Sequence, residues 1–142
     1  MRIRNGLHLA LAVAVVLGLA GCASTGGGGG PSDEEVIQGM LDDVLAALQA
    51  KDIDAMISTY ADDFTSDNGG KEDTKAFLQG AADQGFLDGI EVDQSETAVA
   101  VDGDTASVGP VGLEGAFGAL SLTFNLEKRD GQWWVTSMSQ QM

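Results

Sequence analysis

The sequence predicts an α+β domain in which N-terminal helices pack in a strongly curved antiparallel sheet. Apolar residues recur at helical spacing between positions 32 and 60, and from Gly89 onward their period changes to two. The dipeptide Asp102-Gly103 lies between two alternating segments and is typical of a two-residue hairpin. Helices followed by consecutive hairpins indicate the α+β class, with the helices on one face of the sheet.

Two helices are predicted before residue 61. Ser32 and Glu35 have the spacing of a capping box, in which each side chain accepts a hydrogen bond from the other's backbone N–H. The apolar stripe of this first helix contains Ile37, Met40, Leu41, Val44, Leu45 and Leu48. Lys51 and Asp52 interrupt the pattern, and a second, short helix follows them. Its apolar stripe contains Ile53, Met56, Ile57 and Tyr60.

A third helix is expected after the turn-forming segment DNGG at 67–70. Asp73 or Thr74 could cap its first turn, and we expect it to end near Gly85. It carries the apolar residues Phe77, Leu78 and Ala81.

Strands are predicted at 97–101, 105–108, 120–127 and 133–139. In 120–127 leucine and phenylalanine alternate with polar residues, which is typical of a strand with one buried face. In the last strand Trp133 and Trp134 should point to opposite faces, so that one lies in the core. The glycine-rich segment 109–119 is either a bulged, bent strand or a loop at the mouth of a cavity.

The N-terminus has the features of a secretory signal. Arg2 and Arg4 precede an apolar run that is too short to span a bilayer comfortably. Leu19-Ala20-Gly21-Cys22 resembles the lipobox of bacterial lipoproteins. The resemblance implies that residues 1–21 are removed and that Cys22 is lipidated. Two or three acyl chains on this cysteine would anchor the protein stably in a membrane. An ordinary cleaved signal with an incidental cysteine is the alternative.

The glycine-rich segment that follows Cys22 suits a flexible tether, and residues 22–31 are assigned to it. About ten such residues reach roughly 15–20 Å. Residues 32–142 then form one domain. The expected location is the bacterial cell envelope. Ala23, rather than aspartate, after the cysteine would imply the outer membrane, facing the periplasm, in a Gram-negative cell.

Composition limits the chemistry of the mature chain. Five of the seven basic residues remain after removal of residues 1–21, against 22 acidic residues, which gives a formal charge of −17. The one histidine is also removed, so triads that need imidazole and histidine-ligated zinc are excluded. Nucleic acid is not expected as a partner, because such a negative chain repels phosphates. No cofactor is expected.

Two segments resemble the nuclear transport factor 2-like superfamily, which includes SnoaL-like and ketosteroid-isomerase-like proteins. They are VLAALQAKDIDAMISTYADDF at 44–64 and KRDGQWWVTSMS at 128–139. The resemblance covers essentially all of 33–140 and implies a cone, in which a bent sheet encloses helices around an apolar pocket. It also implies that homodimers form through the outer face of the sheet. The expected pocket-lining residues are Ile57, Tyr60, Phe64, Phe77, Phe117, Leu122 and Phe124.

The catalytic positions of the isomerases are not retained. By this resemblance, the tyrosine that binds the oxyanion falls at Val44 and the general-base aspartate falls at Asn68. Valine cannot donate a hydrogen bond and asparagine cannot accept a proton. Asp67, one residue away, and Tyr60 are the remaining weak candidates for catalysis. The acidic residues near the 67–70 turn lack EF-hand spacing, so we expect a solvated loop without a metal.

Two functions are compatible with these observations. The first is a non-catalytic, lipid-anchored module that binds a small apolar ligand or a protein partner. The alternative is a carboxylate-dependent lyase, isomerase or hydrolase that acts on a small apolar substrate through Asp67 and Tyr60. The alternative requires Asp67 to face the cavity.

Overall fold

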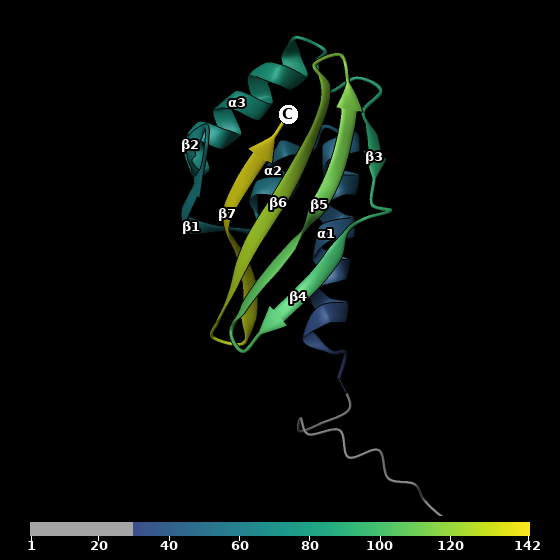
Figure 1. The fold of residues 1–142 in the computed structure, drawn as a ribbon. Helices are drawn as coiled ribbons and strands as arrows, with labels where there is room; N and C mark the ends of the chain where they lie inside the picture. Colours follow the sequence, from purple (N-terminus) through teal and green to yellow (C-terminus); the bar gives the residue numbers. More distant parts are fainter. Residues whose placement is uncertain (1–29) are drawn as a thin grey trace, which may run out of the picture.

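The computed structural model describes residues 30–142. Its helices are α1 (Asp33–Gln49), α2 (Ile53–Ile57) and α3 (Lys71–Asp83) (Figure 1). Its strands are β1 (Tyr60–Ser66), β2 (Gly69–Gly70), β3 (Glu91–Asp93), β4 (Ala98–Asp102), β5 (Thr105–Gly115), β6 (Gly118–Arg129) and β7 (Gln132–Gln141). The signal, Cys22 and nearly all of the tether lie outside the described residues. Within 30–142, no helix is long and apolar enough to span a membrane.

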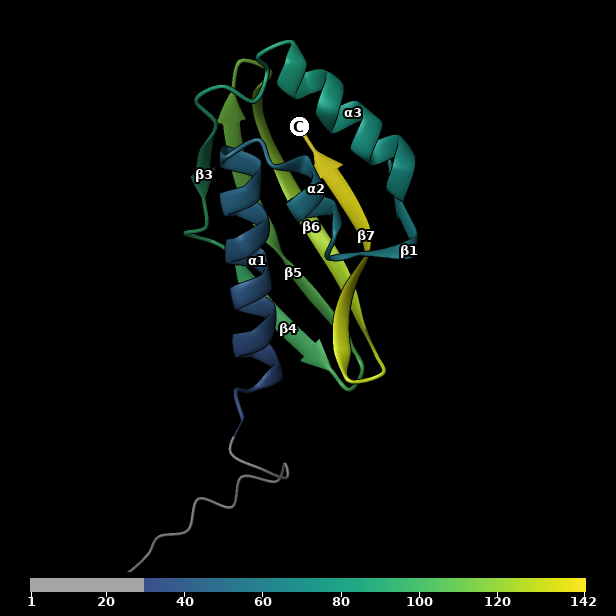
Figure 2. The same ribbon diagram turned by 180° about the vertical axis from the view of Figure 1, so that it is seen from behind.

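The seven strands form one curled, unclosed sheet in the order β2-β1-β7-β6-β5-β3, with β4 also paired to β5. Figure 2 shows α1 against the face of the sheet near β4 and β5. The α+β class is confirmed. The expected antiparallel sheet is wrong at one pairing, because β1 and β7 are parallel. This pairing begins where the Val135 N–H donates to the Thr59 carbonyl at 3.0 Å.

The sequence did not predict β1. Helix α2 ends at Ile57, and Tyr60 begins the strand instead of completing the helical stripe. Tyr60 is buried in this extended conformation, as it would be at the helical position. Helical spacing therefore did not distinguish the two structures. The short strand β3 was also not predicted.

The start of α3 differs from the expected cap. The N-cap is Gly70, and the Asp73 carboxylate accepts a hydrogen bond from the Gly70 N–H at 3.1 Å. Thr74 is fully buried, and its hydroxyl lies 2.8 Å from the Ser66 hydroxyl. Asp73 thus completes the first turn from inside the helix, while Thr74 joins α3 to β1.

The glycine-rich segment 109–119 forms the bent end of β5, a tight turn and the start of β6. The pairing of β5 with β6 shifts between Val108 and Val111, which is a bulge. Gly109 lies in this bulge with φ of +151°. A Cβ there would lie 2.9 Å from the Leu122 carbonyl oxygen, so this position requires glycine.

We therefore expect Gly109→Ala to lower the free energy of unfolding by about 1–3 kcal/mol, measured by urea denaturation. Gly39→Ala is the matched control. Gly39 lies in α1, and a Cβ there would contact nothing within 4 Å. That variant should gain about 0.5–1 kcal/mol from helix propensity. If the two changes alter the free energy of unfolding equally, the bulge does not require glycine at position 109.

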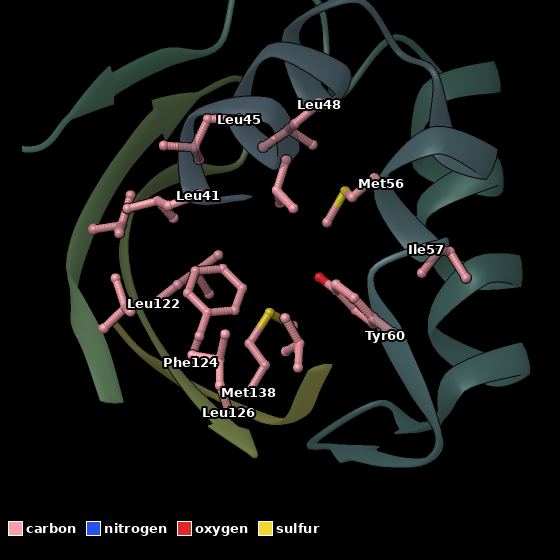
Figure 3. Packing of buried hydrophobic residues seen from close by; sticks show 14 of the residues in the cluster. Leu41, Leu45, Leu48, Met56, Ile57, Tyr60, Leu122, Phe124, Leu126 and Met138 are labelled. Atoms are coloured by element: carbon pink, nitrogen blue, oxygen red, sulfur yellow. The ribbon is translucent and has the colours of Figure 1, made fainter. Parts of the chain in front are cut away.

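The core lies between α1, α2 and the inner face of the sheet. Helix α1 buries its predicted stripe except Met40, which is half-buried, and strands β5 to β7 bury alternate residues. Trp133 is buried and Trp134 is half-buried, as expected from their alternation. Figure 3 shows side chains from α1, α2, β1, β6 and β7 meeting in this cluster.

A hydrogen-bonded group joins the start of α1 to the β6–β7 hairpin. The Asp33 carboxylate accepts from Lys128 Nζ at 2.8 Å and from the Trp133 indole N–H at 3.0 Å. These two hydrogen bonds lower the pKa of Asp33 below its ordinary value of 3.8. A lowered folded-state pKa means that the ionised carboxylate stabilises the fold above that ordinary value. The stabilisation is lost as the pH falls through the folded-state pKa.

Stability should therefore fall as the pH is lowered below about 4 and onward through the lowered pKa of Asp33, and Asp33→Asn should remove part of this fall. Urea unfolding at a series of pH values measures it. Asp43→Asn, at an exposed position of the same helix, is the control. An unchanged pH profile in Asp33→Asn would show that the group contributes nothing to acid sensitivity.

Candidate functional site

An apolar cavity of about 550 Å³ opens at one end of the domain. Its walls come from the end of α1, from α2, from α3 and the segment after it, and from β5, β6 and β7. Figure 1 shows α3 and the β5–β6 turn at the end of the molecule farthest from the start of α1. The volume is within the range of small-molecule binding sites.

The inner wall of the cavity is apolar and buried. It includes Leu48 from α1, Met56 from α2, Leu113 from β5, Leu122 from β6 and Met138 from β7. Because these residues also belong to the core cluster, the cavity extends the core toward one end of the domain. Two of the five are methionines, whose flexible side chains adapt to differently shaped occupants.

The cavity also has exposed apolar residues. Phe77, Phe86 and Phe117 are 54%, 41% and 38% exposed, and Met142 is fully exposed. These four are the exposed large hydrophobic residues of the part of the chain that the structure describes, and all four line the cavity. An exposed apolar patch at a cavity is typical of a binding site rather than of ordinary surface.

The polar side chains of the cavity are uncharged. They are Asn68, Thr74, Gln84 and Gln140. The Thr74 hydroxyl is already paired with Ser66. Although the chain is strongly acidic, no lysine, arginine, aspartate or glutamate among residues 30–142 lines the cavity. The site therefore offers amide groups and apolar surface, and no side chain that would balance a charged ligand.

The structure divides the expected pocket residues into two groups. Phe77, Phe117 and Leu122 line the cavity. The others, Ile57, Tyr60, Phe64 and Phe124, are buried in the core cluster and are not part of the cavity wall. Sequence spacing identifies which side chains are buried, but it does not identify which of them border an unfilled volume. Phe86 and the methionines of the cavity wall were not among the residues predicted to line the pocket.

The two weak catalytic candidates do not come together. Asp67 is exposed, and its carboxylate accepts a hydrogen bond from the Gln140 backbone N–H at 3.2 Å. Tyr60 is completely buried at the opposite end of β1, and burial raises the pKa of its hydroxyl above the ordinary range. Neither residue lines the cavity. A mechanism that uses both on one substrate therefore has no support in this geometry.

The two positions that the resemblance assigns to isomerase chemistry also have different surroundings. Val44 is buried in α1, within the core. Asn68 lines the cavity, so the position of the family's general base faces the site but holds an amide. An amide can orient a ligand by hydrogen bonding, but it cannot take up a proton at neutral pH.

The acidic residues around the 67–70 turn are held separately. Asp62 pairs with Lys71 at 3.1 Å, and Asp63 accepts two hydrogen bonds from Arg129 at 2.8 and 3.0 Å. The hydrogen bonds from Arg129 lower the pKa of Asp63. Across residues 30–142, no group of three or more histidine, cysteine or acidic side chains could hold a metal ion.

Comparisons with known proteins agree with this architecture. No family model and no curated protein matches the sequence. Solved structures do match. A nuclear transport factor 2-like protein of unknown function from Pseudomonas putida has a TM-score of 0.64 and 21% identity, over 75% of this chain and 84% of that protein. One from Shewanella oneidensis gives 0.59 and 20%, over 75% and 96%.

A third structure is a proposed ketosteroid isomerase from Shewanella frigidimarina. It has a TM-score of 0.61 and 18% identity, over 72% of this chain and 92% of that protein. At such low identities the similarity establishes the fold, and function has to be argued from the site itself.

Proposed function

We propose that the SnoaL-like domain of this chain binds a small apolar ligand. The chain has the nuclear transport factor 2-like fold, and proteins that share a fold differ in function according to the residues of their sites. Binding without catalysis is part of the proposal. The observation that carries it is the uncharged apolar cavity of about 550 Å³, whose lining includes Phe77, Phe86 and Phe117. Together with Met142, these rings are the exposed large apolar residues among residues 30–142.

The proposal also places the domain outside the cytoplasm, anchored by lipidated Cys22. Two features support this: the lipobox-like sequence before Cys22 and the glycine-rich segment after it. The start of α1 lies at the end of the domain remote from the β5–β6 turn and α3 (Figure 2). A tether attached there lets the cavity face away from the membrane, toward ligands in the surrounding compartment.

Homodimerisation through the outer face of the sheet remains a prediction. That face is polar where β6 and β7 pair, and Asn125 donates to the Ser137 hydroxyl at 2.9 Å. Light scattering of the purified domain would test it.

Filling the cavity tests the proposed function. Ala81 lies in α3 on the cavity wall, so Ala81→Trp should occupy much of the space. We expect this change to weaken binding of the fluorescent apolar probe N-phenylnaphthylamine at least tenfold in a titration. The indole removes the volume that the probe would enter. Ala46→Trp, at an exposed position of α1 outside the cavity, is the control and should bind as the unmodified domain does.

Thermal unfolding of both variants should be cooperative, which confirms that each is folded. If Ala81→Trp binds the probe normally, the cavity is not the binding site. If the unmodified domain binds no apolar probe, the proposed function is wrong.

A further inference from the structure

The Tyr60 hydroxyl is an unusual group in this core. Tyr60 is 0% exposed, and its hydroxyl is the buried side-chain polar atom without a hydrogen-bond partner among residues 30–142. A buried hydroxyl without a partner loses its hydration and gains nothing in return, which is unfavourable. The ring itself is well packed, because its centroid is 4.4 Å from that of Phe64. The packing therefore accounts for the ring and leaves the hydroxyl unexplained.

The hydroxyl points toward the part of the core that adjoins the cavity. Figure 3 shows the oxygen of Tyr60 directed inward from β1, toward the region of Met56 and Met138. Both methionines line the cavity, as does Leu48. Tyr60 thus lies behind the inner wall of the cavity, where that wall consists of flexible thioether side chains. For the hydroxyl to reach an occupant of the cavity, these methionine side chains would have to change rotamer, which their flexibility allows.

The protonation state of Tyr60 defines what it can bind. Burial raises the pKa of the hydroxyl, so it keeps its proton at neutral pH and can donate it. The matching group on a ligand is then a hydrogen-bond acceptor. The acceptor should be neutral, because none of the described side chains at the cavity is charged, and a buried carboxylate or phosphate would lack a counter-ion.

We propose that the ligand is an uncharged, largely apolar molecule with a carbonyl or similar acceptor at its inner end, and that the Tyr60 hydroxyl donates a hydrogen bond to that acceptor. This inference rests on the proposed function, because it requires the cavity to bind a ligand. It adds the polarity, the charge and the orientation of that ligand. Amides at Asn68 and Gln140 remain available to polar groups elsewhere on the molecule.

Three probes of equal chain length test the inference: methyl decyl ketone, dodecane and dodecanoate. Each is measured by its displacement of N-phenylnaphthylamine from the folded domain. The ketone should bind roughly fivefold to tenfold more tightly than the alkane, which is the effect of one hydrogen bond. Dodecanoate at neutral pH should bind more weakly than both.

Tyr60→Phe removes only the hydroxyl. The variant should lose the preference for the ketone and bind dodecane as the unmodified domain does. Its midpoint of thermal unfolding without ligand should be unchanged or higher, because no hydrogen bond within the described residues is lost. Retention of the ketone preference, or equal affinities of ketone and alkane before the change, would overturn the inference while leaving the proposed function intact. Failure of all three probes to displace bound N-phenylnaphthylamine would also overturn the inference, whereas failure of N-phenylnaphthylamine itself to bind would refute both.

Discussion

Phe64→Ala should lower the free energy of unfolding by about 3–5 kcal/mol. Phe64 is 2% exposed and stacks at an angle on Tyr60, where β1 meets the core. Truncation removes the packing of the ring and leaves a cavity. Strand β1 is hydrogen-bonded to β2 on one side and to β7 on the other, so its backbone cannot move in to close this cavity. Domains of this size are stable by only about 5–15 kcal/mol, so the loss is a large share of the total.

Phe77→Ala is the matched comparison, since it makes the same chemical change at a residue that is 54% exposed. It should cost less than about 1 kcal/mol of stability and should weaken binding of the apolar probe. Urea denaturation and probe titration on both variants measure the difference. A large loss of stability in Phe77→Ala, or a small one in Phe64→Ala, would contradict the division between core and cavity.

Cys22→Ser should release the protein from the membrane. The proposed anchor consists of acyl chains on this cysteine, and serine provides no thiol for their attachment. Two or three acyl chains bind a bilayer stably, and the variant lacks the cysteine that carries them. The loss of membrane binding should therefore be nearly complete. Metabolic labelling with a radioactive fatty acid, followed by separation of membrane and soluble fractions, measures both the modification and its effect.

Ser24→Ala, two residues later, is the control and should stay labelled and membrane-bound. If Cys22→Ser remains in the membrane fraction, the anchor is not this cysteine. If the unmodified protein is secreted and carries no fatty-acid label, its N-terminus is an ordinary cleaved signal instead.

Several elements of the fold could be predicted from local sequence. The capping pair Ser32 and Glu35 is present, with hydrogen bonds of 2.8 and 3.2 Å. The hairpin at Asp102-Gly103 is also present, with Gly103 at φ of +62°. In both cases the signal depends on neighbours in the chain, so a single sequence contains the necessary information.

Elements that depend on distant partners were not predicted. Strand β1 forms because β7, about 75 residues later, offers a parallel edge to it. Its burial does not alternate, so it gives no period of two. The separation of Tyr60 from Asp67 also follows from the formation of β1. These two residues are close in sequence, but Tyr60 begins this extended strand and Asp67 directly follows its last residue.

The candidate site was only partly predictable. Phe77, Phe117 and Leu122 were recognised as apolar residues of the right elements, but Phe86 follows a helix end and has no periodic neighbours. The charge-free lining also could not be anticipated in a chain with 22 acidic residues, because it depends on which faces meet. The unpartnered Tyr60 hydroxyl is a property of packing alone.

A crystal structure of the domain with methyl decyl ketone shows directly whether the cavity binds such a ligand and how the ligand is oriented. The alkyl chain should lie in the cavity between α3 and β6, and the ketone oxygen should lie about 2.8 Å from the Tyr60 hydroxyl. A ketone bound only outside this cavity, or a cavity that stays empty at saturating ketone, would contradict this proposal.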